Sequence, residues 1–552
     1  MAKATTTDCN TNRKLESDDA MKVRMIAILL AATACAGAAF ADVSEVETES
    51  GVLRGFASAH QPEVTVFEGI AFAAPPVGEL RWRPPTEPIP FAGVKDADRI
   101  GPACWQARNS DASLYARGNL HRSEDCLYLN LYTSAADAGE RLPVMVWYHG
   151  GGNTTGHAGA RIFDGANLAA RGAVVITANY RLGPLGFFSH PALSGESAEN
   201  SSGNYGLLDQ LAALEWVRDN VAGFGGDPER VTIFGQSAGG TDVCLLQTSP
   251  LAEGLVDRVI GQSPVCIKLD RDLEQGHAAG NVYAENLGVT GSDDAETLAR
   301  LRAIPAEQLI ATPGAATGPV IDGWVVPDRP YDVFASGGHN RIPVMVGGMS
   351  DEYYGLQHTA APISEAELDS YLEGAFGGEA GTIKSLYPAA LDLSPLDARK
   401  EVMGDNAFLL DTRMWARLAG SHGDPAYVYY FSRPAPVFRL YVHEDPDLTG
   451  NGGVRTFGAY HSGDLAYVFD NLDLVGLDWD DADRALAGTI AGYWVNFAAT
   501  GDPNGPGLPE WPTYDPKADV VQILDSEVRA AVHPKAEQLE FLEELYLRGI
   551  SR

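Results

Sequence analysis

Short apolar runs rich in β-branched side chains recur along the middle of the chain and predict buried strands. They have few polar interruptions, which is typical of strands covered on both faces in a parallel sheet. These runs occupy residues 142–150, 172–183, 230–235, 255–263 and 341–348.

A helical pattern fills the interval between the second and third runs. Residues 204–225 carry a stripe of apolar side chains at helical spacing, which consists of Leu207, Leu208, Leu211, Leu214 and Val217. We expect Gly223 to end this helix, because glycine is a common stop signal. Strands that alternate with helices predict an α/β fold with a mostly parallel central sheet flanked by helices.

The pattern predicts one large domain after an N-terminal segment. A length of 552 residues would allow two to four domains, and 45% hydrophobic residues can bury a large core. No linker rich in proline, glycine and serine divides the sequence, and it contains no internal repeat. We therefore expect residues 42–552 to form a single domain with long insertions.

Residues 1–41 have the pattern of an export signal. Lys22 and Arg24 precede an apolar stretch that ends in Ala39-Phe40-Ala41, a small-x-small cleavage pattern. We expect cleavage after Ala41 and a periplasmic or secreted protein.

Two alternatives concern this leader. The first 20 residues are polar, which is unusual before a signal, so Met21 is an alternative start. Lipidation at Cys35 is a second alternative, although the three residues before it fit a lipidation site poorly.

The formal net charge of −34 is spread along the chain rather than gathered in a tail. This charge argues against nucleic acid and against stable association with anionic membranes, because both would repel an acidic surface. The simplest interpretation is a solvated acidic surface that favours high solubility.

Four of the six cysteines follow the leader, namely Cys104, Cys126, Cys244 and Cys266. An even number in an exported protein predicts disulfides, although spacing alone leaves the pairing open. Pairing of Cys104 with Cys126 would close a loop of about 20 residues and stabilise the fold by about 3 kcal/mol. Cys244 and Cys266 could pair or remain two buried thiols. The spacing contains no CxxC pattern, so we expect no zinc site.

The segment "RVTIFGQSAGG" predicts a nucleophile elbow. A strand, the sequence Gly235-x-Ser237-x-Gly239 and a helix follow one another, and the glycines leave room for a serine at strained backbone angles. The serine would lie at a helix N-terminus, where N–H groups favour developing negative charge. The alternative is a small residue in a tight corner.

A second glycine motif predicts an oxyanion hole. His149-Gly150-Gly151-Gly152 follows a predicted strand, and adjacent glycines let backbone N–H groups approach a substrate oxygen. A flexible loop is the alternative. A phosphate loop is excluded because no Gly-Lys-Ser/Thr follows.

With these motifs the chain resembles the type-B carboxylesterases, the α/β-hydrolase family that includes the cholinesterases. The resemblance implies an α/β-hydrolase fold whose long insertions form an active-site gorge, and hydrolysis of small-molecule esters without cofactor or metal. The matching segments are "FEGIAFAAPPVGELRWRPP" (67–85), "SEDCLYLNLY" (123–132), "NYRLGPLGFF" (179–188), "GNYGLLDQLAALEWV" (203–217), "FGGDPERVTIFGQSAGG" (224–240) and "NFAATGDPNGPGLPEWPTYDP" (496–516).

The resemblance also implies a catalytic triad. Ser237 is the nucleophile, Glu352 in "GGMSDEYYG" the acid and His461 in "GAYHSGDLAYVF" the base. Tyr353 replaces the usual glycine after the acid, and Asp351 is the alternative acid.

Further roles follow from the same resemblance. The oxyanion donors are the N–H groups of Gly151, Gly152 and Ala238. Cys104 and Cys126 match the first disulfide of the family, which makes this the expected pair.

Four residues are candidates for the substrate pocket. Cholinesterases bind the quaternary amine on a tryptophan, but here Ala116 takes that position with Tyr115 beside it, so we exclude choline esters. Two phenylalanines narrow the cholinesterase acyl pocket, and Pro313 and Ala315 replace them. This change predicts tolerance of bulky acyl groups.

The fourth candidate is Gln236, where the family commonly carries glutamate. The neutral amide removes a buried negative charge beside His461. We expect weaker stabilisation of the imidazolium and less repulsion of an anionic substrate.

A polycarboxylate ester is a candidate substrate, because some exported bacterial relatives hydrolyse the tricarballylate esters of fumonisin toxins. Such a substrate would need positive charge near the mouth of the site, for which the candidates are Arg117, Arg122, Arg161 and His157.

Two other functions are alternatives. One is an interfacial lipase, although no amphipathic lid can be identified. The other is a non-catalytic cholinesterase-like binding protein, which typically lacks the serine.

Overall fold

The structure is a computed structural model, and it describes residues 43–108, 113–115, 120–291, 293–315, 317–439 and 453–550. The predicted leader, Ala116 and Arg117 lie outside these residues.

The central element is a sheet of eleven strands in the order β16-β15-β14-β13-β12-β11-β9-β10-β8-β4-β3. In this order, all neighbours from β15 through β9 to β10 run parallel, and antiparallel strands flank them at both edges. The five predicted strands are confirmed, and they form the parallel centre. The parallel strands are β9 (Leu142–Tyr148), β10 (Val174–Ala178), β11 (Gly226–Gln236), β12 (Arg258–Gln262), β13 (Val344–Met349), β14 (Ala426–Phe431) and β15 (Val520–Leu524).

The remaining strands lie at the edges or outside this sheet. The antiparallel edge strands are β3 (Phe56–Ala57), β4 (Thr65–Ala71), β8 (Tyr128–Thr133) and β16 (Arg529–Val532). Two small sheets are separate, and they consist of β1 (Glu45–Thr48), β2 (Gly51–Arg54) and β5 (Val94–Asp96), and of β6 (Ala103–Cys104) and β7 (Arg122–Ser123).

Two hydrophobic cores cover the two faces of the sheet. In β9, Val144, Val146 and Tyr148 point into one core, and the alternate residues Met145 and Trp147 point into the other. This two-sided burial explains why the strand is apolar without interruption. The first core includes side chains of α5 (Tyr205–Asn220), α6 (Ala238–Thr248) and α16 (Leu410–Ser421), and the second those of η2 (Arg161–Phe163), α17 (Leu465–Val468) and α19 (Asp481–Thr500).

The predicted helix over residues 204–225 is α5 followed by a 3-10 turn, η3 (Val221–Phe224). The predicted stop at Gly223 is wrong, because that glycine lies within the turn. Gly225 ends the segment with φ +79°, a left-handed conformation that favours glycine.

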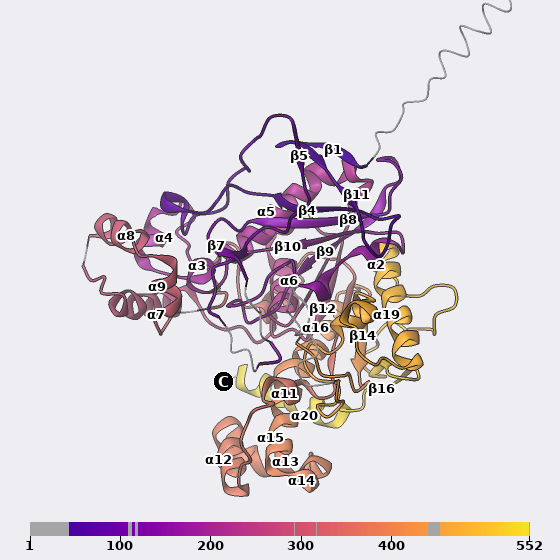
Figure 1. Cartoon of the computed structure of the whole chain (residues 1–552). Coiled ribbons are helices and arrows are strands. Elements are labelled where there is room, and N and C mark those ends of the chain that lie inside the picture. The colour runs from indigo at the N-terminus through magenta and orange to yellow at the C-terminus, as the bar shows by residue number, and fades with distance from the viewer. Residues whose placement is uncertain are drawn as a thin grey trace, which may run out of the picture. The chain divides into compact units, whose positions relative to one another are not determined.

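Helical insertions follow the parallel strands (Figure 1). Between β12 and β13 lie α7 (Leu273–Asn286), α8 (Asp294–Arg302), α9 (Ala306–Ala311) and α10 (Pro330–Ser336). Between β13 and β14 lie α11 (Glu352–Leu356), α12 (Glu365–Phe376), α13 (Ala380–Ser385), α14 (Pro388–Leu393), α15 (Pro395–Gly404), a π-helix (Asp405–Leu409) and α16. Figure 1 shows that α7, α8 and α9 form one group and α12 to α15 another.

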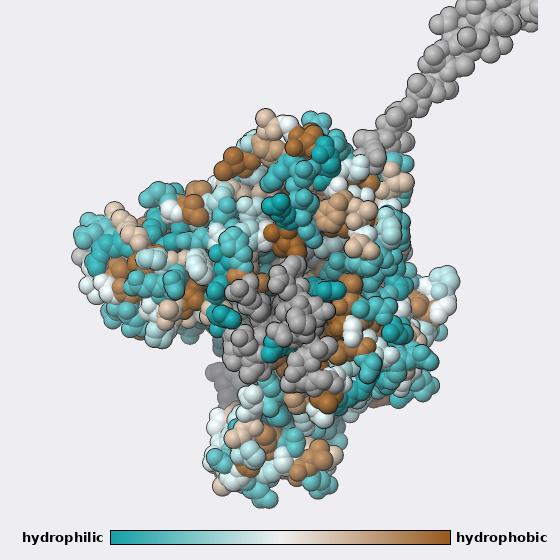
Figure 2. Space-filling model, viewed as in Figure 1, coloured by the Kyte–Doolittle hydropathy of each residue, from teal (hydrophilic) through white to brown (hydrophobic). Residues whose placement is uncertain are grey.

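The other helices are short, apart from the last. They are α2 (Ala166–Ala169), α3 (Gly183–Phe187), α4 (Pro191–Glu196), α18 (Leu472–Val475) and the C-terminal α20 (Ala536–Ile550). Within the described ranges, no helix has the length and apolar content needed to cross a bilayer. On the face shown in Figure 2, hydrophobic residues are scattered among hydrophilic ones.

Asp483 anchors the first turn of α19 through a buried charge cluster. Its carboxylate accepts hydrogen bonds from Arg433 Nε at 2.8 Å, from the Tyr467 hydroxyl at 2.9 Å and from Arg455. Burial alone would raise the pKa of Asp483, but the bonds from Arg455 and Arg433 outweigh it and lower the pKa to about 2.

We predict that Asp483→Asn lowers the free energy of unfolding at pH 7 by about 2 kcal/mol. Because the folded pKa lies below that of the unfolded chain, this stability is fully present above about pH 5 and is lost as the pH falls from about 4 to 2. Urea unfolding from pH 7 to pH 2 would measure the difference between variant and wild type. Asp481→Asn, at an exposed position of the same helix, is the control, and a pH-independent difference would contradict the prediction.

Candidate active site

Ser237 occupies a strained turn between β11 and α6. Its φ is +57°, and its N–H donates to the carbonyl of Gln262 at 2.8 Å. A Cβ on Gly235 would lie 2.4 Å from the Gly239 carbonyl, and a Cβ on Gly239 would lie 2.0 Å from the carbonyl oxygen of Tyr148. Both positions therefore require glycine. The half-buried serine stands at the N-terminus of α6, where the first N–H groups have no partner within the helix.

His461 and Glu352 meet in a buried contact close to this turn. His461 Nδ1 lies 2.5 Å from Glu352 Oε2, and each residue is 2% exposed. The other carboxylate oxygen, Oε1, accepts hydrogen bonds from Ser263 Oγ at 2.6 Å and from the Met349 N–H at 2.9 Å. The carboxylate is therefore fixed on both oxygens, and its ring partner has the Nδ1–H tautomer.

Asp351, the alternative acid, has other partners. Its carboxylate accepts the N–H of Ala459 at 3.0 Å and the hydroxyl of Ser350. Tyr353, which replaces the usual glycine, is the second residue of α11, where no left-handed backbone is needed. The structure thus brings Glu352, rather than Asp351, against His461.

Three further side chains surround His461. The Nε2 atom of Gln236 lies 3.0 Å from His461 Nε2, and Gln236 is fully buried. The ring of Phe408, on the π-helix, lies over the imidazole with a centroid distance of 4.7 Å. The hydroxyl of Tyr115 donates to the His461 carbonyl at 2.9 Å. Two of the predicted pocket residues, Gln236 and Tyr115, therefore contact His461.

The Gly150-Gly151-Gly152 loop passes directly over the elbow. A Cβ on Gly150 would lie 2.9 Å from Ser237 Cβ, so only glycine permits this approach. Gly151 and Gly152 have φ values of +117° and +63°, which glycine adopts readily. Ala238, the first residue of α6, directly follows Ser237, so its N–H also lies near this turn.

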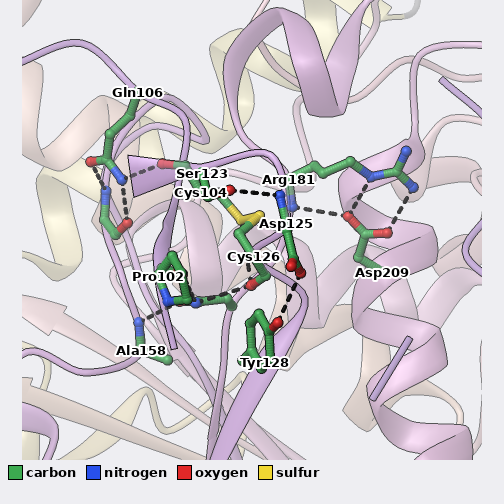
Figure 3. Close-up of a disulfide and its surroundings, with 12 residues drawn as sticks. Pro102, Cys104, Gln106, Ser123, Asp125, Cys126, Tyr128, Ala158, Arg181 and Asp209 are labelled. Atoms are coloured by element: carbon green, nitrogen blue, oxygen red, sulfur yellow. Dashed lines mark hydrogen bonds and ion pairs between the residues drawn. A yellow bond between two sulfur atoms is a disulfide. The ribbon is translucent and has the colours of Figure 1, made fainter. Parts of the chain in front are cut away.

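Cys104 and Cys126 form a disulfide, and the Gln106 side chain near it donates to the Cys104 carbonyl at 3.0 Å (Figure 3). The same side chain donates to the Gly156 carbonyl at 2.7 Å and accepts the Gly156 N–H at 2.8 Å. A Cβ on Gly156 would lie 2.2 Å from the His149 ring, so this stretch is tightly packed. The pair implied by the resemblance is formed, and its loop braces the glycine loop.

Cys244 and Cys266 also form a disulfide, which resolves the pairing that the sequence left open. Cys244 lies on α6 and Cys266 follows β12, and both are fully buried. This disulfide therefore links α6, which directly follows Ser237, to the segment that carries Ser263.

The family comparison agrees with this geometry. A model described as the carboxylesterase family matches residues 42–377 and 382–542. The chain belongs to the carboxylesterase family. It is a carboxylic ester hydrolase with the α/β-hydrolase fold.

Relatives support the same assignment over nearly the whole length. A fumonisin B1 esterase from Sphingopyxis macrogoltabida is 35% identical over 505 residues, covering 89% of each chain. A liver carboxylesterase from Sus scrofa is 35% identical over 525 residues, covering 87% of this chain and 89% of the relative. A solved carboxylesterase from Geobacillus stearothermophilus has a TM-score of 0.74 and 31% identity, covering 90% of this chain and 99% of the relative.

The other predicted pocket residues of this carboxylesterase have contacts away from Ser237, Glu352 and His461. Pro313 is exposed, and its carbonyl accepts from Asn286 of α7 at 3.2 Å. Ala315 is half-buried and packs against the first core. Their predicted role in the acyl pocket stays a prediction.

Among the cationic candidates, Arg122 lies over the Trp105 ring at 5.4 Å and donates to the Gln106 carbonyl at 2.9 Å. His157 is buried, and Arg161 begins η2. Among the described residues, no group of three or more His, Cys, Asp or Glu side chains is arranged to hold a metal.

Ser263 and Phe408 contact Glu352 and His461 but were not predicted from the sequence. A signal for Ser263 exists, because Gly-Gln-Ser occurs at 235–237 and again at 261–263, and the two copies end adjacent parallel strands in register. Phe408 is presented by a π-helix, a feature frequent at functional sites that has no comparable sequence signal.

We predict that Ser263→Ala lowers kcat for a neutral ester about tenfold and leaves KM within about twofold, because Glu352 loses one of the bonds that orient it. Steady-state kinetics on 4-nitrophenyl butyrate would measure both constants. Ser350→Ala, which removes a hydroxyl bonded to Asp351 instead, is the control. An equal loss in both variants would contradict a specific role for Ser263.

Proposed function

We propose that this carboxylesterase hydrolyses esters through a Ser237-His461-Glu352 triad and an acyl-enzyme intermediate. The observation that carries the proposal is the buried 2.5 Å contact between Glu352 Oε2 and His461 Nδ1 beside a serine on a strained turn. Bulky acyl esters are the proposed substrates, and a polycarboxylate ester is one candidate.

In the first half of the reaction, Ser237 Oγ attacks the ester carbonyl and gives its proton to His461 Nε2. Glu352 keeps the imidazole in the tautomer that can accept this proton, and it stabilises the imidazolium that forms. The oxyanion accepts hydrogen bonds from the N–H groups of Gly151, Gly152 and Ala238. Each such donor typically contributes about 2.7–4 kcal/mol of transition-state stabilisation.

The tetrahedral intermediate then collapses to an acyl-serine. The ester C–O bond breaks, and the alcohol leaves with the proton from His461. In the second half, water gives a proton to His461 and attacks the acyl carbon, and collapse returns the proton to Ser237 and releases the acid.

The substrate class is supported by relatedness. One relative at 35% identity is named for its action on fumonisin B1. In the sequence, Pro313 and Ala315 stand where cholinesterases carry two phenylalanines, but the contacts found for both residues lie away from Ser237 and His461. The relative therefore carries the preference for a large natural ester over acetate esters.

We also propose that residues 1–41 are a signal that is removed after Ala41, with residues 42–552 as the mature domain. Two buried disulfides support export, because such bonds persist in oxidising compartments. Determination of the mature N-terminus tests this proposal.

We predict that Ser237→Ala lowers kcat/KM at least about 10³-fold and abolishes stoichiometric labelling by an organophosphate, because the attacking oxygen is lost. Mass spectrometry of the labelled peptide and ester kinetics would measure the two effects. Ser263→Ala is the control and should still be labelled. Wild-type protein that takes up no label and hydrolyses no ester would favour the binding-protein alternative.

We predict that kcat/KM for 4-nitrophenyl esters does not fall from acetate through butyrate to decanoate, because the acyl side lacks two aromatic rings. Ala315→Phe should lower the values for the long chains more than for acetate. A sharp preference for acetate in the wild type would contradict the prediction. A jump in activity above the critical micelle concentration of the substrate would favour the lipase alternative.

A further inference from the structure

The side chain of Gln236 is fully buried and contacts the imidazole of His461. Gln236 directly precedes Ser237, and its Nε2 atom lies 3.0 Å from His461 Nε2. His461 directs Nδ1 to Glu352, so the Nε2 atom of the neutral ring carries a lone pair. This lone pair can accept a hydrogen bond from the side-chain N–H of Gln236.

A second glutamine occupies the matching position on the next strand. Gln236 and Gln262 are register partners at the ends of β11 and β12, and each precedes a serine with positive φ. Gln262 Nε2 donates to Asp464 Oδ2 at 2.9 Å, so it satisfies a different carboxylate. Two neutral amides therefore lie side by side beneath the triad.

The charged and titratable groups that face His461 are few in the described part of the chain. Glu352 bonds to its Nδ1 atom, and the Tyr115 hydroxyl bonds to its carbonyl. Asp464 is fully buried, and burial raises its pKa to about 7, so it carries only part of a negative charge near neutral pH. Tyr429 faces the same carboxylates, and burial keeps its pKa well above the ordinary value.

We propose that Gln236 is a specificity-determining residue whose uncharged amide holds neutral His461 and admits an ester with an anionic acyl group. The proposal rests on the function proposed above and names a substrate class for that site. A carboxylate at this position would stand beside the reacting carbonyl and would repel a substrate carboxylate through poorly screened surroundings.

The amide also suits both protonation states of the base. Before an ester binds, Gln236 donates its N–H to the Nε2 lone pair of neutral His461, and this bond gives way when the Ser237 hydroxyl approaches Nε2. Once Nε2 has taken the serine proton, it becomes a donor, and rotation of the amide brings Oε1 to accept from it. A glutamate could serve only the protonated ring, and it would stabilise that ring more strongly.

Gln236→Glu is the decisive variant, with a matched pair of esters as probes. The probes are 4-nitrophenyl pentanoate and the 4-nitrophenyl half-ester of succinate, which have acyl chains of similar length and differ in charge. We expect the ratio of kcat/KM for the anionic to the neutral ester to fall about tenfold at pH 8, and to change little between low salt and 0.5 M NaCl, because salt screens a buried charge weakly. We also expect the acid limb of the pH profile for the neutral ester to move upward by about one pH unit, because glutamate favours the imidazolium.

Gln236→Met is the matched control, because it removes the hydrogen bond without adding charge. It should lower kcat for both esters by similar factors and leave their ratio within about twofold of the wild type. A ratio that falls in Gln236→Met as in Gln236→Glu would assign the effect to lost positioning and would overturn the charge argument.

Organophosphate labelling of Ser237 separates the possible failures. Labelled Gln236→Glu protein with an unchanged ester ratio and an unchanged acid limb would overturn this proposal alone. Wild-type protein that takes up no label would overturn the proposed triad instead. If Gln236→Glu does not fold, the wild type still decides, because a kcat/KM for the succinate half-ester more than 100-fold below that of the pentanoate would contradict the proposal.

Discussion

The hydrogen bond between Glu352 and His461 joins residues 109 positions apart, and the site depends on it. A buried carboxylate is stable only if its oxygens are satisfied, and here Ser263 and the Met349 N–H share Oε1 while the imidazole takes Oε2. The ends of β12 and β13 must therefore lie in register, and the segment that carries His461 must return to the same edge. The parallel centre of the sheet provides this convergence, because its strands end together.

Close backbone packing determines the positions of the glycine loop and of the turn that carries Ser237. The Gly239 backbone lies so near the Tyr148 carbonyl that any side chain would clash, and a Cβ on Gly150 would lie 2.9 Å from Ser237 Cβ. The two disulfides lie at the segments that keep this packing, one beside the glycine loop and one between α6 and the segment after β12.

The charge around this carboxylesterase site contrasts with that of the whole chain. The protein carries a formal charge of −34, yet the neutral amides of Gln236 and Gln262 end adjacent strands beside His461 and Asp464. The carboxylate bonded to His461 is Glu352, and Asp464 is partly protonated near neutral pH. The acidic surface would repel an anionic ester as it approaches, and salt would screen this repulsion. The neutral amides beside His461 would add no further repulsion once the ester is bound.

The sequence by itself determined the five central parallel strands, the elbow at Ser237 and the glycine loop, because burial on both faces and tight turns leave local patterns, but it did not indicate β14 and β15. It also determined which glutamate and histidine resemble those of a known family. Only the tertiary structure decided that Ser263 binds Glu352, that Phe408 covers His461, that Cys244 pairs with Cys266 and that Gln236 bonds to the base. The structure also decided that the helical segment ends at Gly225 rather than at Gly223. These features are contacts between segments far apart in the chain, or small differences in where a turn ends. Neither produces a repeating pattern of apolar and polar residues that the sequence would show.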